Sequence, residues 1–217
     1  MIKYLNRLKN KRGFTLVELI VVIAIIGVLA AILTPIMMGV VVKARVTSAN
    51  TTASRIGRAA NMLLVQWGSM GYGGVGRATV LFNITVKRTG KQTVWSCSSP
   101  DTSGLSSSGD VKWGTTGTFT TGDDPDKITS GEALICAALC DAFGTMSKAS
   151  MVIVVSGGKV TFVAYTEATN DVLPTSEYPQ PVDGTPPAGF AWNGTTEGIS
   201  PSGMAIGTYP QIPLVKK

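Results

Sequence analysis

The sequence contains no histidine among its 217 residues. Histidine is the usual general base of serine and cysteine hydrolases and a common ligand of catalytic zinc, so its absence excludes histidine-dependent triads and most zinc sites. The chain also lacks a GxxxxGK[ST] loop, which would bind the phosphates of a nucleotide. We therefore expect a protein that is not an enzyme and that holds no cofactor.

Calcium is the metal for which the sequence offers ligands. Asp123, Asp124 and Asp126 lie in the segment GDDPDK, and calcium prefers carboxylates together with loop carbonyls. Their spacing is not that of an EF-hand loop. We therefore favour a solvated loop before a helix and predict no metal site.

Charged residues make up only 15% of the chain, and Glu18 is the single one between Phe14 and Val42. As a helix, these 29 residues would extend about 43 Å at roughly 1.5 Å per residue. The hydrocarbon core of a bilayer is about 30 Å thick, so the segment is long enough to cross a membrane. The part beyond about residue 68 is instead rich in Gly, Ser, Thr and Pro, which indicates a separate soluble part.

Acidic residues are missing from residues 1–13, which carry five of the charges in the formal net charge of +6. The remainder is close to neutral, so the high pI gives no reason to predict nucleic-acid binding. A short basic segment before a membrane span stays in the cytoplasm, which places the C-terminal part outside. The apolar run is about twice as long as the core of a secretory signal, so an uncleaved signal anchor is one interpretation.

Glu18 needs an explanation, because a carboxylate in hydrocarbon is costly without a partner. In a signal-anchored surface protein it would lie at the cytoplasmic interface near Arg12. The string KRGFTLVELI, residues 11–20, resembles instead the processing signature of type IV prepilins and pseudopilins. It has basic residues, Gly13, then Phe14, and a carboxylate at the fifth residue counted from Phe14, followed by a long apolar run.

The resemblance implies how the chain is processed and assembled. A prepilin peptidase would cut between Gly13 and Phe14, and the new amine of Phe14 would be N-methylated. Glu18 of one subunit would then pair with the Phe14 amine of a neighbour, which favours assembly because two buried opposite charges in contact largely cancel. Membrane lipid would surround the helix before assembly, and pilus assembly machinery would extract the subunit into a helical homo-oligomer.

Localisation and role follow from the same resemblance. The chain would first be a single-pass protein of the cytoplasmic membrane with its C-terminal head outside, and then part of an extracellular filament. We predict a structural subunit of a type IV pilus-like surface filament that serves adhesion, motility or DNA uptake. A pseudopilin of a type II secretion or competence machine would share every N-terminal residue named above and is the alternative.

The resemblance also implies an α+β fold, a lollipop with one long N-terminal helix packed on a small antiparallel sheet head. The expected divisions are a leader removed on processing (1–13), a transmembrane and filament-core half of the helix (14–42), an amphipathic half (43–67) and a globular head with a Pro-rich C-terminal segment (68–217). Pro35 lies where the family commonly has a proline, and it should bend the helix because it has no amide hydrogen.

Periodicity predicts how the amphipathic half packs. Apolar residues recur at alternating steps of four and three, which forms a stripe along one helix face. The stripe comprises Val42, Val46, Ala49, Ala53, Ile56, Ala60, Leu63 and Trp67. We expect it to pack on the head rather than form a coiled-coil seam, because its small residues allow a sheet to approach. Glycines from Gly68 onward should end the helix.

Within the head, alternating residues predict a hairpin in which Thr89 and Gly90 form the turn and Arg88 pairs with Lys91. Residues 98–125 read as an exposed loop. A helix should follow, with Thr129 and Glu132 as its capping box and a stop near Gly144. Residues 151–166 predict a central hairpin turning at 157–158, and the Pro-rich segment from residue 171 predicts extended loop rather than sheet.

The three cysteines are Cys97, Cys136 and Cys140. Residues four apart on one helix have poor disulfide geometry, so a bridge between Cys136 and Cys140 is disfavoured. Cys97 should face the core and could pair with Cys140 or with Cys136, which would leave one thiol. Three buried free cysteines are the alternative.

Overall fold

A computed structural model describes residues 14–70, 73–75, 79–99, 105–107, 111–169 and 204–211. The leader with Gly13, and most of the Pro-rich segment, lie outside the described residues. The chain divides into two compact units, residues 1–43 and 44–217. Helix α1 (Leu16–Met70) begins in the first unit and ends in the second, so the expected long N-terminal helix is confirmed.

The end of α1 differs from the expectation. Gly68 lies inside the helix, which continues to Met70. The reason is tertiary packing, because Trp67 in the last turns is 7% exposed and its ring meets that of Trp113 edge-on at a centroid distance of 5.9 Å. Burial of this ring outweighs the low helix propensity of a single glycine. Pro35 lies within α1, which is assigned as helix on both sides of it.

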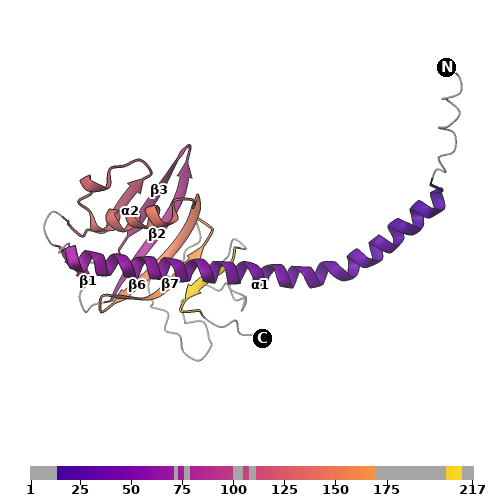
Figure 1. Cartoon of the computed structure of the whole chain (residues 1–217), viewed down its shortest axis with the longest axis horizontal. Coiled ribbons are helices and arrows are strands. Elements are labelled where there is room, and N and C mark those ends of the chain that lie inside the picture. The colour runs from indigo at the N-terminus through magenta and orange to yellow at the C-terminus, as the bar shows by residue number, and fades with distance from the viewer. Residues whose placement is uncertain are drawn as a thin grey trace, which may run out of the picture. The chain divides into compact units, whose positions relative to one another are not determined.

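The second unit contains a six-stranded antiparallel sheet in the order β5-β3-β2-β6-β7-β8 (Figure 1). Its strands are β2 (Thr79–Thr89), β3 (Gln92–Ser98), β5 (Thr116–Thr120), β6 (Lys148–Ser156), β7 (Lys159–Thr166) and β8 (Ile206–Tyr209). A separate two-stranded sheet pairs β1 (Gly73–Val75) with β4 (Leu105–Ser107). The remaining elements are η2 (Pro125–Lys127) and α2 (Gly131–Phe143).

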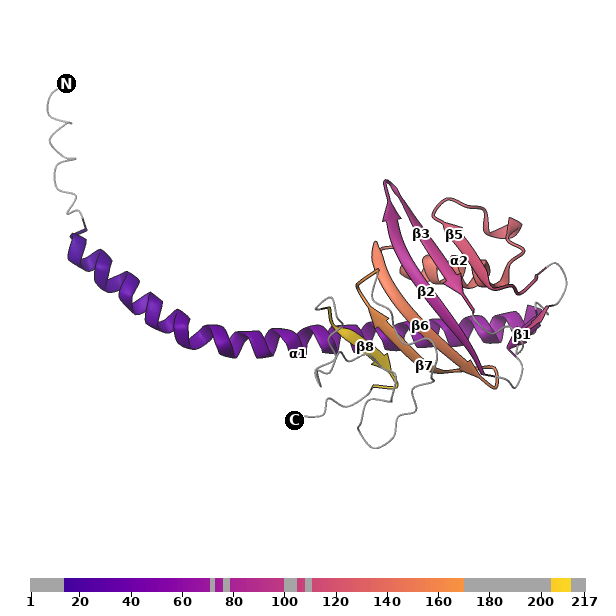
Figure 2. The ribbon, with the colours of Figure 1, turned by 180° about the vertical axis from the view of Figure 1, so that it is seen from behind.

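Helix α2 and the part of α1 beyond residue 43 cover the same face of this sheet, as the two opposite views show (Figures 1 and 2). The core lies between the helices and the sheet. The predicted stripe on α1 is part of it. Its most buried members, each no more than 7% exposed, are Val46, Ala49, Ala53, Ile56, Ala60 and Trp67. The prediction that the stripe packs on the head is confirmed, and the fold is α+β.

The hairpin of β2 and β3 has the predicted faces with a different turn. Val86 pairs with Trp95 and Ile84 with Cys97, and all four point into the core. The turn residues are Gly90 and Lys91 rather than Thr89 and Gly90, because Gly90 adopts φ +65° at the first central position. The pairing therefore shifts by two residues, which preserves the face of every side chain.

Two segments predicted as loops contain strands, namely 98–125 with β4 and β5, and the C-terminal segment with β8. The stretch 98–125 includes β5, which pairs with β3 and buries Phe119 opposite Trp95. Strand β8 lies in the C-terminal segment and pairs with β7, and β4 pairs with the Gly-rich β1. Each pairs with a strand distant in the sequence, so local composition did not reveal it. The central hairpin of β6 and β7, turning at Gly157 and Gly158, is as predicted.

Helix α2 ends before Gly144 as expected, but its cap is not Thr129. Ser130 is the N-cap, and its hydroxyl accepts the Ala133 N–H at 3.4 Å. Glu132 is fully buried and accepts hydrogen bonds from the Gly114 N–H at 3.0 Å and from the Ser130 hydroxyl at 2.9 Å. The carboxylate thus joins the start of α2 to the segment before β5.

Candidate functional site

Helix α1 begins at a reciprocal capping box. Glu18 Oε2 accepts hydrogen bonds from the Thr15 N–H and from the Thr15 hydroxyl, each at 2.8 Å. In return, the Thr15 hydroxyl accepts the Glu18 N–H at 3.2 Å. The sequence signal was available, because T-x-x-E before an apolar run is typical of this cap. Sequence reasoning considered only a neighbouring subunit or the cytoplasmic interface as the place for Glu18. Glu18 therefore has a role within its own helix.

The first unit exposes a continuous apolar helix surface next to this cap. Phe14 is 86% exposed, and the large apolar residues from Leu16 to Met37, together with Val40 and Val41, are each at least 42% exposed. Among the described residues, one helix is long and apolar enough to cross a membrane. An apolar surface of this extent requires lipid or other apolar helices around it, because water would solvate it unfavourably.

In the second unit, two asparagines of α1 form hydrogen bonds to β7 and β8, the last two strands at one edge of the sheet. Asn50 Oδ1 accepts the N–H of Thr208 in β8 at 2.8 Å, and Asn61 Oδ1 accepts the N–H of Val160 in β7 at 2.8 Å. Sequence reasoning missed both. They are eleven residues, about three turns, apart, so they share one helix face beside the apolar stripe. Polar residues at that spacing next to a buried stripe were the available signal.

Glycines allow β8 to lie directly against α1. A Cβ atom on Gly207 would overlap the backbone carbonyl of Ala49, so the strand and the helix touch through their main chains. Two residues further along β8, the ring of Tyr209 packs over Gly57 of α1. A Cβ atom added to Gly57 would lie 2.7 Å from this ring. The last described strand is thereby held by both the sheet and the helix.

The cysteines are close together and reduced. Cys97, Cys136 and Cys140 are free thiols, and each is buried. Interaction with the Cys136 thiol, burial and the nearby Glu132 carboxylate raise the pKa of Cys97 well above its usual value. Burial, together with Asp141 and Cys136, raises the pKa of Cys140.

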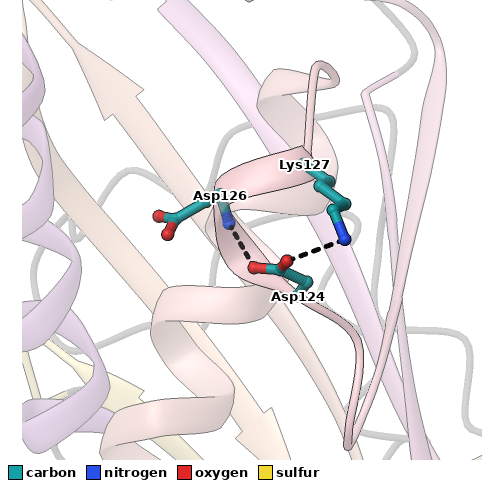
Figure 3. A network of polar contacts seen from close by, with 3 residues as sticks. All are labelled: Asp124, Asp126 and Lys127. Atoms are coloured by element: carbon teal, nitrogen blue, oxygen red, sulfur yellow. Dashed lines mark hydrogen bonds and ion pairs between the residues drawn. The ribbon is translucent and has the colours of Figure 1, made fainter.

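Two of the three aspartates before α2, Asp123 and Asp124, accept hydrogen bonds from the local backbone, and Figure 3 shows the contacts of Asp124. Asp124 caps η2 by accepting the Asp126 N–H at 3.2 Å and pairs with Lys127 at 3.1 Å. Asp123 accepts the Thr120 N–H at 2.7 Å, and the Asp126 carboxylate points away from Asp124. Across the described ranges, no group of three or more Cys, Asp or Glu residues could hold a metal ion.

Comparison with protein families identifies the N-terminal segment. Residues 8–34 match the family described as the prokaryotic N-terminal methylation motif, the signature of type IV prepilins. With the apolar helix, this motif fits a membrane-anchored, single-pass, type IV pilin-like protein that is processed by a prepilin peptidase. No solved structure matches the chain.

Proposed function

We propose that this protein is a structural subunit of a type IV pilus-like surface filament. Cleavage between Gly13 and Phe14 removes the basic leader, and the amine of Phe14 is N-methylated. The helix is stored in the cytoplasmic membrane with the second unit outside, and the assembly machinery transfers it from lipid into the core of a helical filament. The supporting observation is the exposed apolar surface of α1 from Leu16 to Met37, most of which lies within the methylation motif at residues 8–34.

Helix–helix contact in a filament replaces lipid around that surface without exposing it to water. Apolar contact alone is non-directional, so it would allow neighbouring helices to slide along each other. A charged pair supplies the missing register, because a carboxylate in an apolar bundle is stable only beside a cation. Glu18 and the Phe14 amine of a neighbouring subunit form this pair in the proposed filament.

The capping box is compatible with this pairing. Both bonds from Thr15 are accepted by Oε2 of Glu18. Among the described residues, no hydrogen bond to Oε1 is formed, so that oxygen can face the amine of a neighbour. One carboxylate can thus complete its own helix end and hold the adjacent subunit.

The cap also defines a matched pair of variants. Glu18→Gln keeps an acceptor for the Thr15 N–H but removes the charge, whereas Thr15→Val keeps the charge but removes the hydroxyl of the cap. Loss of the partner of a buried charge should lower the equilibrium constant for adding a subunit by about a hundredfold or more. We therefore expect Glu18→Gln to abolish filaments and Thr15→Val to retain them.

The measurement combines electron microscopy of filaments on cells that express one variant as the sole copy with mass spectrometry of the membrane-extracted chain. Both variants should begin at N-methylated Phe14. Wild-type filament numbers from Glu18→Gln would refute the charge pairing. An intact leader in the wild-type chain would refute prepilin processing, and processed wild-type chain without surface filaments would favour the pseudopilin role.

A further inference from the structure

The six-stranded sheet carries a second apolar patch on the face opposite the helices, which the proposed helix assembly does not use. Its side chains alternate along the strands with those that face α1 and α2. Leu81 pairs with Val154, and Val154 pairs with Phe162, so the patch crosses β2, β6 and β7. We call it the far-face patch, and its residues are Leu81, Val152, Val154, Phe162, Ala164 and Ile206.

The far-face patch is buried. Leu81 and Phe162 are each 3% exposed, and no residue of the patch is more than 4% exposed. An antiparallel sheet that leaves one face in water carries polar side chains there, and this face carries apolar ones. Helices α1 and α2 both lie on the other face (Figures 1 and 2), so neither helix covers the patch.

The chain that leaves β7 turns onto this far face. Ser150 of β6 lies between Ala149 and Met151, which face the helices, so its side chain points to the opposite side. The Ser150 hydroxyl donates a hydrogen bond to the carbonyl of Ala168 at 2.6 Å, and Ala168 is 4% exposed. Because β7 ends at Thr166, the chain already lies over the far face of β6 two residues later.

Residues 170–203, which lie outside the described ranges, connect this point to β8. At about 3.3 Å per residue, these 34 residues can extend about 110 Å. Strands β7 and β2 are two strand spacings apart, or about 10 Å, so the segment is long enough to cross the patch and return. It contains six prolines, three aromatic residues and no lysine or arginine. Proline and aromatic rings bury apolar surface without a place in the strand ladder.

We propose that residues 170–203 pack across the far face of the sheet and cover the far-face patch. The second unit then has apolar packing on both faces of its sheet. The inference goes beyond the proposed function and does not depend on it, because it concerns contacts within the second unit alone.

Two buried polar atoms on the same face support this contact. Asn83 Oδ1 and Thr166 Oγ1 are buried and have no hydrogen-bond partner among the described residues. Their neighbours Phe82 and Tyr165 face the helices, so both polar side chains point to the far face. A segment that lies there outside the strand ladder has backbone N–H groups to donate to them, and buried polar groups need such partners.

Photo-crosslinking of the full chain in detergent tests the contact. In Asn83→p-benzoylphenylalanine, the probe lies at the rim of the patch, opposite Val152. Digestion with trypsin and Glu-C places residue 83 in the peptide 78–87. The segment yields the peptides 168–177 and 178–197, which are separate from β7 and β8. After irradiation, we expect the peptide 78–87 to be joined to one or both of these segment peptides.

A mixture of isotopically light and heavy chains distinguishes the segment from a second copy of the chain. Joined peptides should be entirely light or entirely heavy. The matched control is Lys127→p-benzoylphenylalanine, because the Lys127 side chain is 82% exposed on η2, and it should give no such product. Products that join light to heavy peptides, or the lack of any product with 168–197, would overturn the proposal.

Hydroxyl-radical labelling provides a second measurement, in which two phenylalanines on opposite faces are compared. A variant in which a Gly-Ser linker of equal length replaces residues 172–200 should show Phe162 oxidised several-fold faster than in the wild-type chain. Phe82 is 1% exposed on the helix side and should stay protected in both chains. Equal protection of Phe162 in the two chains would show that the segment does not cover it.

Discussion

Gly207→Ala tests the contact between the last described strand and the long helix. The added methyl group would overlap the carbonyl carbon and oxygen of Ala49, which belong to the backbone of α1. No side-chain rotation can relieve this overlap. Strand β8 must therefore move away from α1, which also lengthens the 2.8 Å hydrogen bond from the Thr208 N–H to Asn50.

The loss of stability can be estimated from these two effects. Overpacking in a well-packed core costs about 1–3 kcal/mol, and a buried backbone donor that loses its acceptor costs about 1–3 kcal/mol. Thr208 is 2% exposed, so water does not replace the acceptor. We expect the free energy of unfolding to fall by about 2–6 kcal/mol, against a total of about 5–15 kcal/mol for a typical domain.

The matched control is Gly68→Ala. Gly68 lies in α1, and a Cβ there would meet no heavy atom within 4 Å. Alanine has the higher helix propensity, so this variant should be unchanged or more stable by up to about 1 kcal/mol. The two substitutions are chemically identical and are expected to change stability in opposite directions.

Urea unfolding of the full chain in detergent, followed by tryptophan fluorescence, measures the difference. Trp67 and Trp95 are buried in the second unit, so their emission reports its unfolding. Thermal unfolding followed by the same emission should show a midpoint lower by about 4–24 °C in Gly207→Ala, since 1 kcal/mol corresponds to about 2–4 °C at this size. Equal midpoints for Gly207→Ala and wild type would refute the direct contact of β8 with α1.

Two further predictions concern buried polar groups of the second unit. Glu132→Ala should lower the free energy of unfolding by about 2–3 kcal/mol, because the Gly114 N–H loses its acceptor. Glu132→Gln keeps an acceptor oxygen and should lower the free energy of unfolding by less. Equal losses of stability for the two variants in urea titrations would contradict this role of Glu132. Burial, and the nearby Glu167, raise the pKa of Tyr165 to about 12. Since the unfolded phenol titrates near pH 10, its contribution to stability is complete below about pH 10 and is lost as the pH rises toward 12. The ultraviolet titration of wild type minus Tyr165→Phe should show this transition near 12, and one near 10 would refute it.

Local sequence alone determined the N-terminal segment of this protein. The motif around Gly13 and Phe14, and the apolar run that follows, are contiguous, so neither depends on what the rest of the chain does. The stripe on α1 and the inward faces of β2 and β3 were also predictable, because helix and strand periodicity fix which side chains share a face. The hairpin turn was placed one residue early, yet the faces were right because side chains alternate with a period of two.

Tertiary structure decided what depends on pairs of residues far apart in the chain. Strand β8 is a four-residue segment that becomes a strand only because β7 and α1 supply its partners. The same holds for β5. Its composition is typical of a loop, but it pairs with β3 and buries Phe119 against the sheet. Helices and turns form from neighbours in sequence, whereas sheet edges and helix-to-sheet contacts are set by long-range packing.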